Sequence, residues 1–165
     1  GMETTRNQLG LALQTFLAHP EQWALLAEHP EWGGRAVEEV MRVNPTVTWV
    51  TREAKEDLDL NGLSIPAGGI VQVLSHASGT DPRAMGDKPE FDIRVEGRAL
   101  HSGFGGGAHH CLGHFVARTD MSVALPLLAQ RMPNAVADGP GQWLPVSGNT
   151  GPVRFPIRFT ATGVA

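Results

Sequence analysis

A single cysteine, Cys111, is the residue whose type and surroundings point most directly to chemistry. It lies in a glycine-rich segment, residues 104–113, directly before an apolar stretch with helical periodicity. A lone cysteine excludes an internal disulfide and a zinc site built from several thiolates. Three interpretations remain: a buried inert thiol, a nucleophile, or one thiolate bound to one metal. A glycine-rich loop at a helix start favours the last two, because N–H groups and the positive helix end stabilise a thiolate there.

The elements that position this loop are predicted from hydrophobic periodicity and from proline and glycine positions. Helices are expected over residues 3–18, from Pro20 onward, over 35–43, and over 111–131 with a kink at Pro126. Strands are expected over 47–51, 58–60 and 70–74, with Asn61-Gly62 as a hairpin turn, and residues 152–160 are expected to form a terminal strand or hairpin. Residues 77–103 are expected to form a long irregular loop, with Asp81-Pro82 as a breaker. The order predicts an α+β fold that is mostly helical, with a small β-sheet and the Cys111 loop before a long helix.

The composition limits the class of protein. A chain of 165 residues suffices for one domain, since it buries roughly 70% of its unfolded surface. The net charge of −4 argues against nucleic-acid binding through a basic face. No apolar run approaches the ~20 residues that span a bilayer, and no signal peptide is visible. We therefore expect a cytoplasmic protein with neither nucleic-acid nor membrane partners.

The Cys111 loop resembles the haem-ligand loop of cytochromes P450. The pattern Phe-Gly-x-Gly-x-His-x-Cys-x-Gly, with Ala and Arg further along, is carried here by Phe104, Gly105, Gly107, His109, Cys111, Gly113, Ala117 and Arg118. The resemblance implies haem b as cofactor and Cys111 as the ligand of its iron. A thiolate ligand pushes electron density towards dioxygen on the iron, and N–H donors around the sulfur tune the redox potential.

A second feature is the pair Glu39 and Arg42, which share one helix face at i and i+3. Alone, this spacing more often marks a surface ion pair of little energetic consequence. The pair resembles the Glu-x-x-Arg motif of P450s, which implies a structural role behind the haem loop. The resemblance also implies a third partner, an arginine before the haem segment. Both Arg94 and Arg98 qualify, and Arg94 is preferred.

Further site residues follow from the resemblance alone. Arg52, His101 and His109 correspond to cationic groups or donors that contact the haem propionates. Glu3 and Thr4 correspond to the end of an acid–alcohol motif in a long central helix, which implies that they relay protons. The competing interpretation of Glu3 and Thr4 is an exposed, frayed first helical turn.

The resemblance implies a haem-thiolate monooxygenase that inserts one oxygen atom from dioxygen into a small apolar substrate, with electrons from a ferredoxin-type partner. It covers only the C-terminal part of a P450, so residues 1–165 are expected to be a truncated haem-thiolate domain. Apolar side chains such as Leu9, Leu13, Trp23 and Leu26 would then be bare, which predicts a homo-oligomer, with exchange of the first helix as one route. The alternatives are a catalytically incompetent remnant, haem-free or weakly haem-binding and folded as an oligomer, and, more weakly, a cysteine hydrolase with His109 or His110 as base.

Overall fold

The computed structural model describes residues 2–86, 90–97, 101–145 and 147–162. Its helices in chain order are α1 (Met2–Ala18), α2 (Pro20–Glu28), η1 (Pro30–Trp32), α3 (Gly33–Val43), α4 (Ser75–Thr80), α5 (Pro82–Met85), η2 (Gly107–His109) and α6 (His114–Arg131). Its strands are β1 (Trp49–Glu53), β2 (Leu58–Leu60), β3 (Leu63–Ile65), β4 (Ile70–Leu74), β5 (Val136–Ala137), β6 (Gln142–Trp143), β7 (Pro152–Arg154) and β8 (Ile157–Arg158). The expected α+β, mostly helical fold is confirmed.

The helices α1, α2, α3 and α6 enclose the core. Phe16 of α1 packs against Trp23 of α2 and Phe91, with ring centroids 5.2 Å apart in both cases. The Trp23 indole N–H donates to the Met132 carbonyl directly after α6, at 2.9 Å. Trp23 and Leu26 are 1% and 0% exposed. The prediction that they would be bare was wrong, because α6 and its C-terminal end cover them within the same chain.

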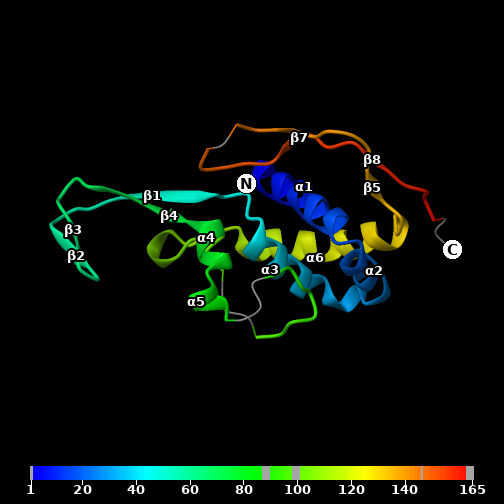
Figure 1. Cartoon of the computed structure of the whole chain (residues 1–165), viewed down its shortest axis with the longest axis horizontal. Helices are drawn as coiled ribbons and strands as arrows, with labels where there is room; N and C mark the ends of the chain where they lie inside the picture. Colours follow the sequence, from blue (N-terminus) through cyan, green and yellow to red (C-terminus); the bar gives the residue numbers. More distant parts are fainter. Residues whose placement is uncertain (1, 87–89, 98–100, 146, 163–165) are drawn as a thin grey trace.

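The strands pair locally and antiparallel: β1 with β4, β2 with β3, β5 with β8 and β6 with β7. The β1–β4 pair projects to one side of the helices, with the β2–β3 hairpin at its tip (Figure 1). Asn61 and Gly62 have φ angles of 52° and 84° and form the predicted hairpin turn. β5 and β7 lie beside α1, and Figure 1 shows β7 above this helix.

Two parts of the segment between the hairpin and the Cys111 loop are helical where a loop was expected. Asp81-Pro82 breaks the chain as predicted, because α4 ends at Thr80, but it also begins a new helix, α5, with proline in its first turn. Asp81 caps this helix, since its carboxylate accepts from the Arg83 backbone N–H at 2.9 Å. Before it, α4 follows β4 directly and packs Gly79 against the end of α3. The rest of the segment that the structure describes, residues 90–97, lacks helix and strand.

Candidate haem-binding site

The site lies between the Cys111 loop, the first turns of α1 and the chain that follows α3. A pocket of about 340 Å³ lies there, within the range of small-molecule and cofactor sites. Cys111, Thr4, Arg52 and His109 line it from segments far apart in the sequence. Its other lining residues are Thr5, Gln8, Met41, Thr46, Val47, Val50, Gly103, Phe104, Gly105, Gly113, Ala117 and Met121.

The loop conformation depends on glycine at two positions. Gly105 and Gly107 have φ angles of 70° and 67°, in the left-handed region that glycine adopts without strain. The turn lets the Cys111 backbone N–H donate to the Phe104 carbonyl at 2.9 Å. Cys111 is half-buried and lies three residues before α6, which begins at His114. The helix therefore begins later than residue 111, and the sulfur belongs to the loop and not to the first helical turn.

The polar groups of the pocket lie around a largely apolar interior. Arg52 is exposed on β1, and one of its guanidinium nitrogens donates to the Thr51 carbonyl at 3.0 Å. His109 is exposed at the end of η2. Thr4 lines the pocket, whereas Glu3 is exposed and pairs with Arg6 at 3.4 Å. A Cβ at Gly113 would meet no atom within 4 Å, so this wall is open to a flat group.

This donor set fits a haem. It combines one thiol, a mainly apolar interior and two side chains at the rim that pair well with carboxylates. Arg52 and His109 are thus brought together with Cys111, as the sequence predicts, and so are Phe104, Gly105, Gly113 and Ala117. Gly107 shapes the loop without lining the pocket in the part of the chain that the structure describes.

His101 is placed differently from its expected position at a propionate. It does not line the pocket; its Nε2 lies 3.1 Å from Glu38 Oε2, and its Nδ1 accepts from the Gly103 backbone N–H at 3.0 Å. The side chain is 4% exposed. Both ring nitrogens therefore contact protein groups, and the geometry does not support a propionate contact.

The Glu39–Arg42 pair is buried, with side chains 6% and 1% exposed. Arg42 binds both Glu39 carboxylate oxygens, at 2.7 and 2.8 Å, and also donates to the Gly79 and Glu90 carbonyls at 2.7 and 2.9 Å. The Glu39 carboxylate in turn accepts from the Asp92 backbone N–H at 2.9 Å. The pair thus joins α3 to the segment before the Cys111 loop, which a surface ion pair would not do.

Arg94, the preferred third partner, lies elsewhere. Its guanidinium binds both oxygens of Asp92 at 2.8 Å and is 61% exposed. The choice of Arg94 is therefore corrected: Asp92 is only two residues away and offers a nearer carboxylate than Glu39. The other candidate, Arg98, lies outside the described residues.

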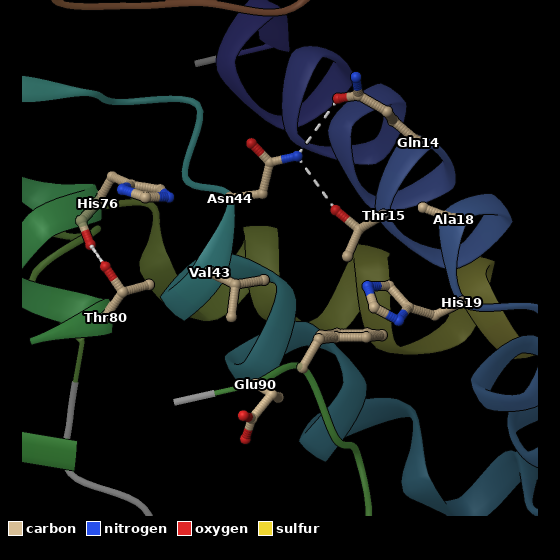
Figure 2. A pocket seen from close by; sticks show the side chains of 10 residues that line it. Gln14, Thr15, Ala18, His19, Val43, Asn44, His76, Thr80 and Glu90 are labelled. Carbon is tan, nitrogen blue, oxygen red and sulfur yellow. Dashed lines mark hydrogen bonds between the residues drawn. The ribbon is translucent and has the colours of Figure 1, made fainter. Parts of the chain in front are cut away.

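A second pocket of about 590 Å³ lies between α1, the end of α3 and α4 (Figure 2). Figure 2 shows His76 and His19 on opposite sides of it, with Asn44 between them. The Asn44 amide donates to Thr15 Oγ1 at 3.1 Å and to Gln14 Oε1 at 3.4 Å. Asn44 thus joins the end of α3 to α1, which is a structural role.

Sequence reasoning missed two groups near the site. Glu38 accepts from Arg118 Nε at 2.5 Å and contacts His101. Gln8 accepts from the Thr46 backbone N–H at 2.8 Å and donates to the Asn44 carbonyl at 2.9 Å, which fixes the chain where it passes the pocket. In the sequence, only the position of Glu38 next to Glu39 indicated a role for Glu38. Hydrophobic periodicity does not predict which of two adjacent acidic side chains faces the protein interior.

Comparison with known proteins identifies the family of the chain. The cytochrome P450 family profile matches residues 34–139. Luteothin monooxygenase of Streptomyces thioluteus is 42% identical over 162 residues, which are 98% of this chain and 40% of that protein. The biotin biosynthesis cytochrome P450 of Bacillus subtilis (strain 168) is 36% identical over 160 residues, 96% of this chain and 40% of that protein.

Solved structures give the same result. P450BioI in complex with a hexadec-9Z-enoic acid-ligated acyl carrier protein has a TM-score of 0.89 and 34% identity, over 96% of this chain and 41% of that one. CalO2 has a TM-score of 0.89 and 34% identity, over 98% of this chain and 41% of that one.

The chain belongs to the cytochrome P450 family, whose cofactor is haem iron. It spans about 40% of the length of the curated relatives it matches and corresponds to their C-terminal part. Within the described residues, no helix is both long and apolar enough to cross a membrane.

Proposed function

We propose that this chain supplies the haem-thiolate part of a P450 monooxygenase, with Cys111 as the iron ligand. The observation that supports it best is the pocket that collects Cys111, Arg52, His109 and Thr4 from separate segments. The family match supports monooxygenase chemistry, and the apolar lining supports an apolar substrate. When bound, haem iron supplies the activation of dioxygen.

The residues of the chain have distinct roles in this proposal. Cys111 would hold the iron, and Arg52 and His109 would donate to the propionates. Gly105 and Gly113 would keep side chains away from the macrocycle, and Gly107 allows the turn of the loop. Thr4 offers a hydroxyl inside the pocket that would hold a proton there, and Glu3, one residue away on the exposed turn, would exchange protons with solvent.

The test is the ligation of iron by Cys111. After haem is added to the purified chain, the reduced, CO-treated sample is expected to show the red-shifted thiolate band. Cys111→Ser should abolish this band, since a serine hydroxyl is not a thiolate. Leu112→Ala, a change at the adjacent, fully exposed side chain, serves as the matched control and should retain it. A band that persists in Cys111→Ser would rule out Cys111 as the ligand.

For the substrate and the electron donor we propose a chemical class. The relatives carry names that indicate different reactions: one is a luteothin monooxygenase and another a nocardicin C N-oxygenase. For this chain we propose a small apolar substrate and a ferredoxin-type donor that docks on the Cys111 side. Reduced ferredoxin with its reductase should then generate the CO band without dithionite, and failure to do so would exclude that class of donor.

A second candidate, a chain that binds haem weakly and turns nothing over, is favoured by one observation. The accessible surface is 9941 Å², whereas a compact monomer of this mass exposes about 7,900 Å². The excess indicates faces that an active P450 covers. Haem stoichiometry measured together with peroxide-driven oxidation of an apolar probe separates the candidates, since haem binding without turnover matches only the second.

A further inference from the structure

One carboxylate, Glu38 on α3, contacts both sides of the Cys111 loop. Its Oε1 accepts from Arg118 Nε at 2.5 Å, and its Oε2 accepts from an Arg118 terminal nitrogen at 3.1 Å. The same Oε2 lies 3.1 Å from His101 Nε2. Because His101 precedes the loop and Arg118 follows it, a single side chain fixes both of its ends. These three residues, Glu38, His101 and Arg118, are called the Glu38 clamp.

The hydrogen bonds determine the tautomer of His101. Its Nδ1 lies 3.0 Å from the Gly103 backbone N–H and must accept, since that N–H is a donor only. A neutral ring with an acceptor at Nδ1 carries its proton on Nε2, which then donates to Glu38. Both ring nitrogens thus serve to position the loop, and a propionate contact would require one of these bonds to break.

The clamp continues to the sulfur through Phe104. The Arg118 guanidinium lies over the Phe104 ring, 4.3 Å from its centroid, where a cation is attracted to the π face. The Phe104 carbonyl accepts from the Cys111 backbone N–H at 2.9 Å. A carboxylate on α3 is therefore connected to the backbone of Cys111 by contacts that the structure shows at each step.

We infer that Glu38, through His101 and Arg118, is the positioning residue that holds the Cys111 loop in its ligand conformation, and that His101 acts in this clamp rather than at a propionate. The inference concerns the site assigned under the proposed function and rests on it only for the role of Cys111 as ligand. The clamp itself is a property of the folded chain with or without haem.

The first test uses the haem-free chain and amide hydrogen exchange. Glu38→Gln keeps the shape of the side chain but removes the charge that pairs with Arg118 and leaves one oxygen to accept where two accepted before. Charge-assisted hydrogen bonds of this kind are strong enough that exchange at Gly103 and Cys111 should accelerate roughly tenfold or more. The matched control is Glu96→Gln. Glu96 is an exposed residue that pairs with Arg35, which lies on α3 like Glu38. This change should leave both rates unchanged. Unchanged rates in Glu38→Gln would overturn the clamp.

His101→Asn tests the clamp independently if Glu38→Gln does not fold. The asparagine amide oxygen replaces Nδ1 as acceptor for Gly103, but its side chain is too short to replace Nε2 at Glu38. His101 lies three residues before Phe104, whose carbonyl accepts from the Cys111 N–H. Because the loss of the bond to Glu38 frees this stretch of backbone, the clamp predicts faster exchange at Cys111 in the haem-free variant, with Gly103 remaining protected. A residue that acts only on a propionate would change neither rate in the absence of haem, so slow exchange at Cys111 would refute the proposal.

A second readout uses the haem-loaded chain. Glu38→Gln should lower the fraction of the thiolate CO band several-fold, while Glu96→Gln retains it. Absence of this band in the wild-type chain would contradict the proposed function. The clamp would then be tested by the hydrogen-exchange experiment alone, since that experiment uses the haem-free chain. A wild-type chain with the band, but with loop exchange unaffected by Glu38→Gln, would contradict the clamp alone.

Discussion

At the scale of single residues, the buried Glu39–Arg42 pair carries the largest predicted effect on stability. Removing one partner of a buried ion pair leaves an uncompensated charge and costs about 3–5 kcal/mol. Arg42→Met should lower the free energy of unfolding by that amount, because Glu39 then loses both of its bonds to the guanidinium. Urea titration followed by far-UV circular dichroism measures the change.

The control for this prediction is Arg94→Gln. The Arg94 side chain is largely exposed and pairs with Asp92 at the surface, so its removal should have little effect. A large loss of stability in Arg94→Gln, or none in Arg42→Met, would contradict the assigned roles.

Glu38 makes the stability depend on pH. Partial burial acts to raise the pKa of its carboxyl, but hydrogen bonds from His101 and Arg118 outweigh this and lower the pKa from 4.5 to about 2. Because the folded pKa lies below the unfolded value, Glu38 stabilises the fold above pH 4.5. That contribution is lost as the pH falls from 4.5 towards 2.

The measurement compares urea unfolding of the wild type and Glu38→Gln at several pH values. The wild type should be more stable at pH 6, and the difference should shrink steadily below pH 4.5. A difference that is the same at every pH would show that Glu38 is not ionised in the clamp.

Sequence reasoning identified the Cys111 loop because its glycines and histidine have fixed spacing. It failed at Glu38 and His101 for a physical reason. Whether Glu38 or Glu39 faces a given neighbour depends on the rotation of α3 against α6, which two adjacent acids do not reveal. The hydrogen bonds of His101 depend on the approach of Gly103, a contact that only the folded loop defines.

At the scale of elements, α3 crosses α6 at a point set by a glycine and a proline. A Cβ on Gly33 would lie 2.2 Å from the Ser122 carbonyl oxygen and 3.0 Å from a Pro126 side-chain carbon. Pro126 has no N–H to donate to the carbonyl four residues earlier, that of Ser122. α3 therefore approaches α6 most closely at the turn where the backbone hydrogen bonding of α6 is interrupted.

Gly33→Ala is expected to destabilise the fold by about 1–3 kcal/mol, because the new methyl group meets backbone atoms that must shift. Gly34→Ala is the matched control, since nothing lies within 4 Å of its Cβ position. That change should be neutral or stabilising by up to about 1 kcal/mol, owing to the higher helix propensity of alanine. Thermal unfolding distinguishes the two; equal effects would contradict the packing.

Element boundaries were predicted less well where tertiary bonds decide them. β1 was expected over 47–51 but spans Trp49–Glu53. The preceding residues bond elsewhere: the Thr48 N–H donates to the Gly148 carbonyl, and the Thr46 carbonyl accepts from Thr150. These partners are about 100 positions away in sequence, so local patterning could not predict them.

At the scale of the whole molecule, α6 is apolar on two faces. One face packs in the core through Met121, Leu125 and Ala129. The other is solvent-exposed and carries Val116, Val123 and Leu127 as an apolar stripe, flanked by Phe115, which is 73% exposed, and by Leu112 just before the helix, which is 99% exposed. An exposed apolar stripe of this length promotes association. An oligomer is therefore still predicted, but the surface expected to form its interface is on α6 instead of α1 and α2.

We therefore predict concentration-dependent dimers of the isolated chain in sedimentation velocity. Phe115→Glu should weaken the dimer at least tenfold by placing a charge in the interface. Leu63→Glu removes an equally exposed apolar side chain from the projecting hairpin and should leave the dimer intact. If both variants, or neither, lose the dimer, the stripe on α6 is not the interface. α1 packs on α3 and α6 of its own chain, so exchange of this helix is not required.

The hydrogen bond between Trp23 and Met132 joins residues 109 positions apart. Its consequence is one of timing. A nascent chain presents α1 and α2 well before their covering surface has been synthesised, and the pocket that joins Thr4 to Met121 closes only after α6 docks. Folding governed by such distant contacts is slow, and it leaves Phe16, Trp23 and Leu26 available to chaperones or to other chains in the interval.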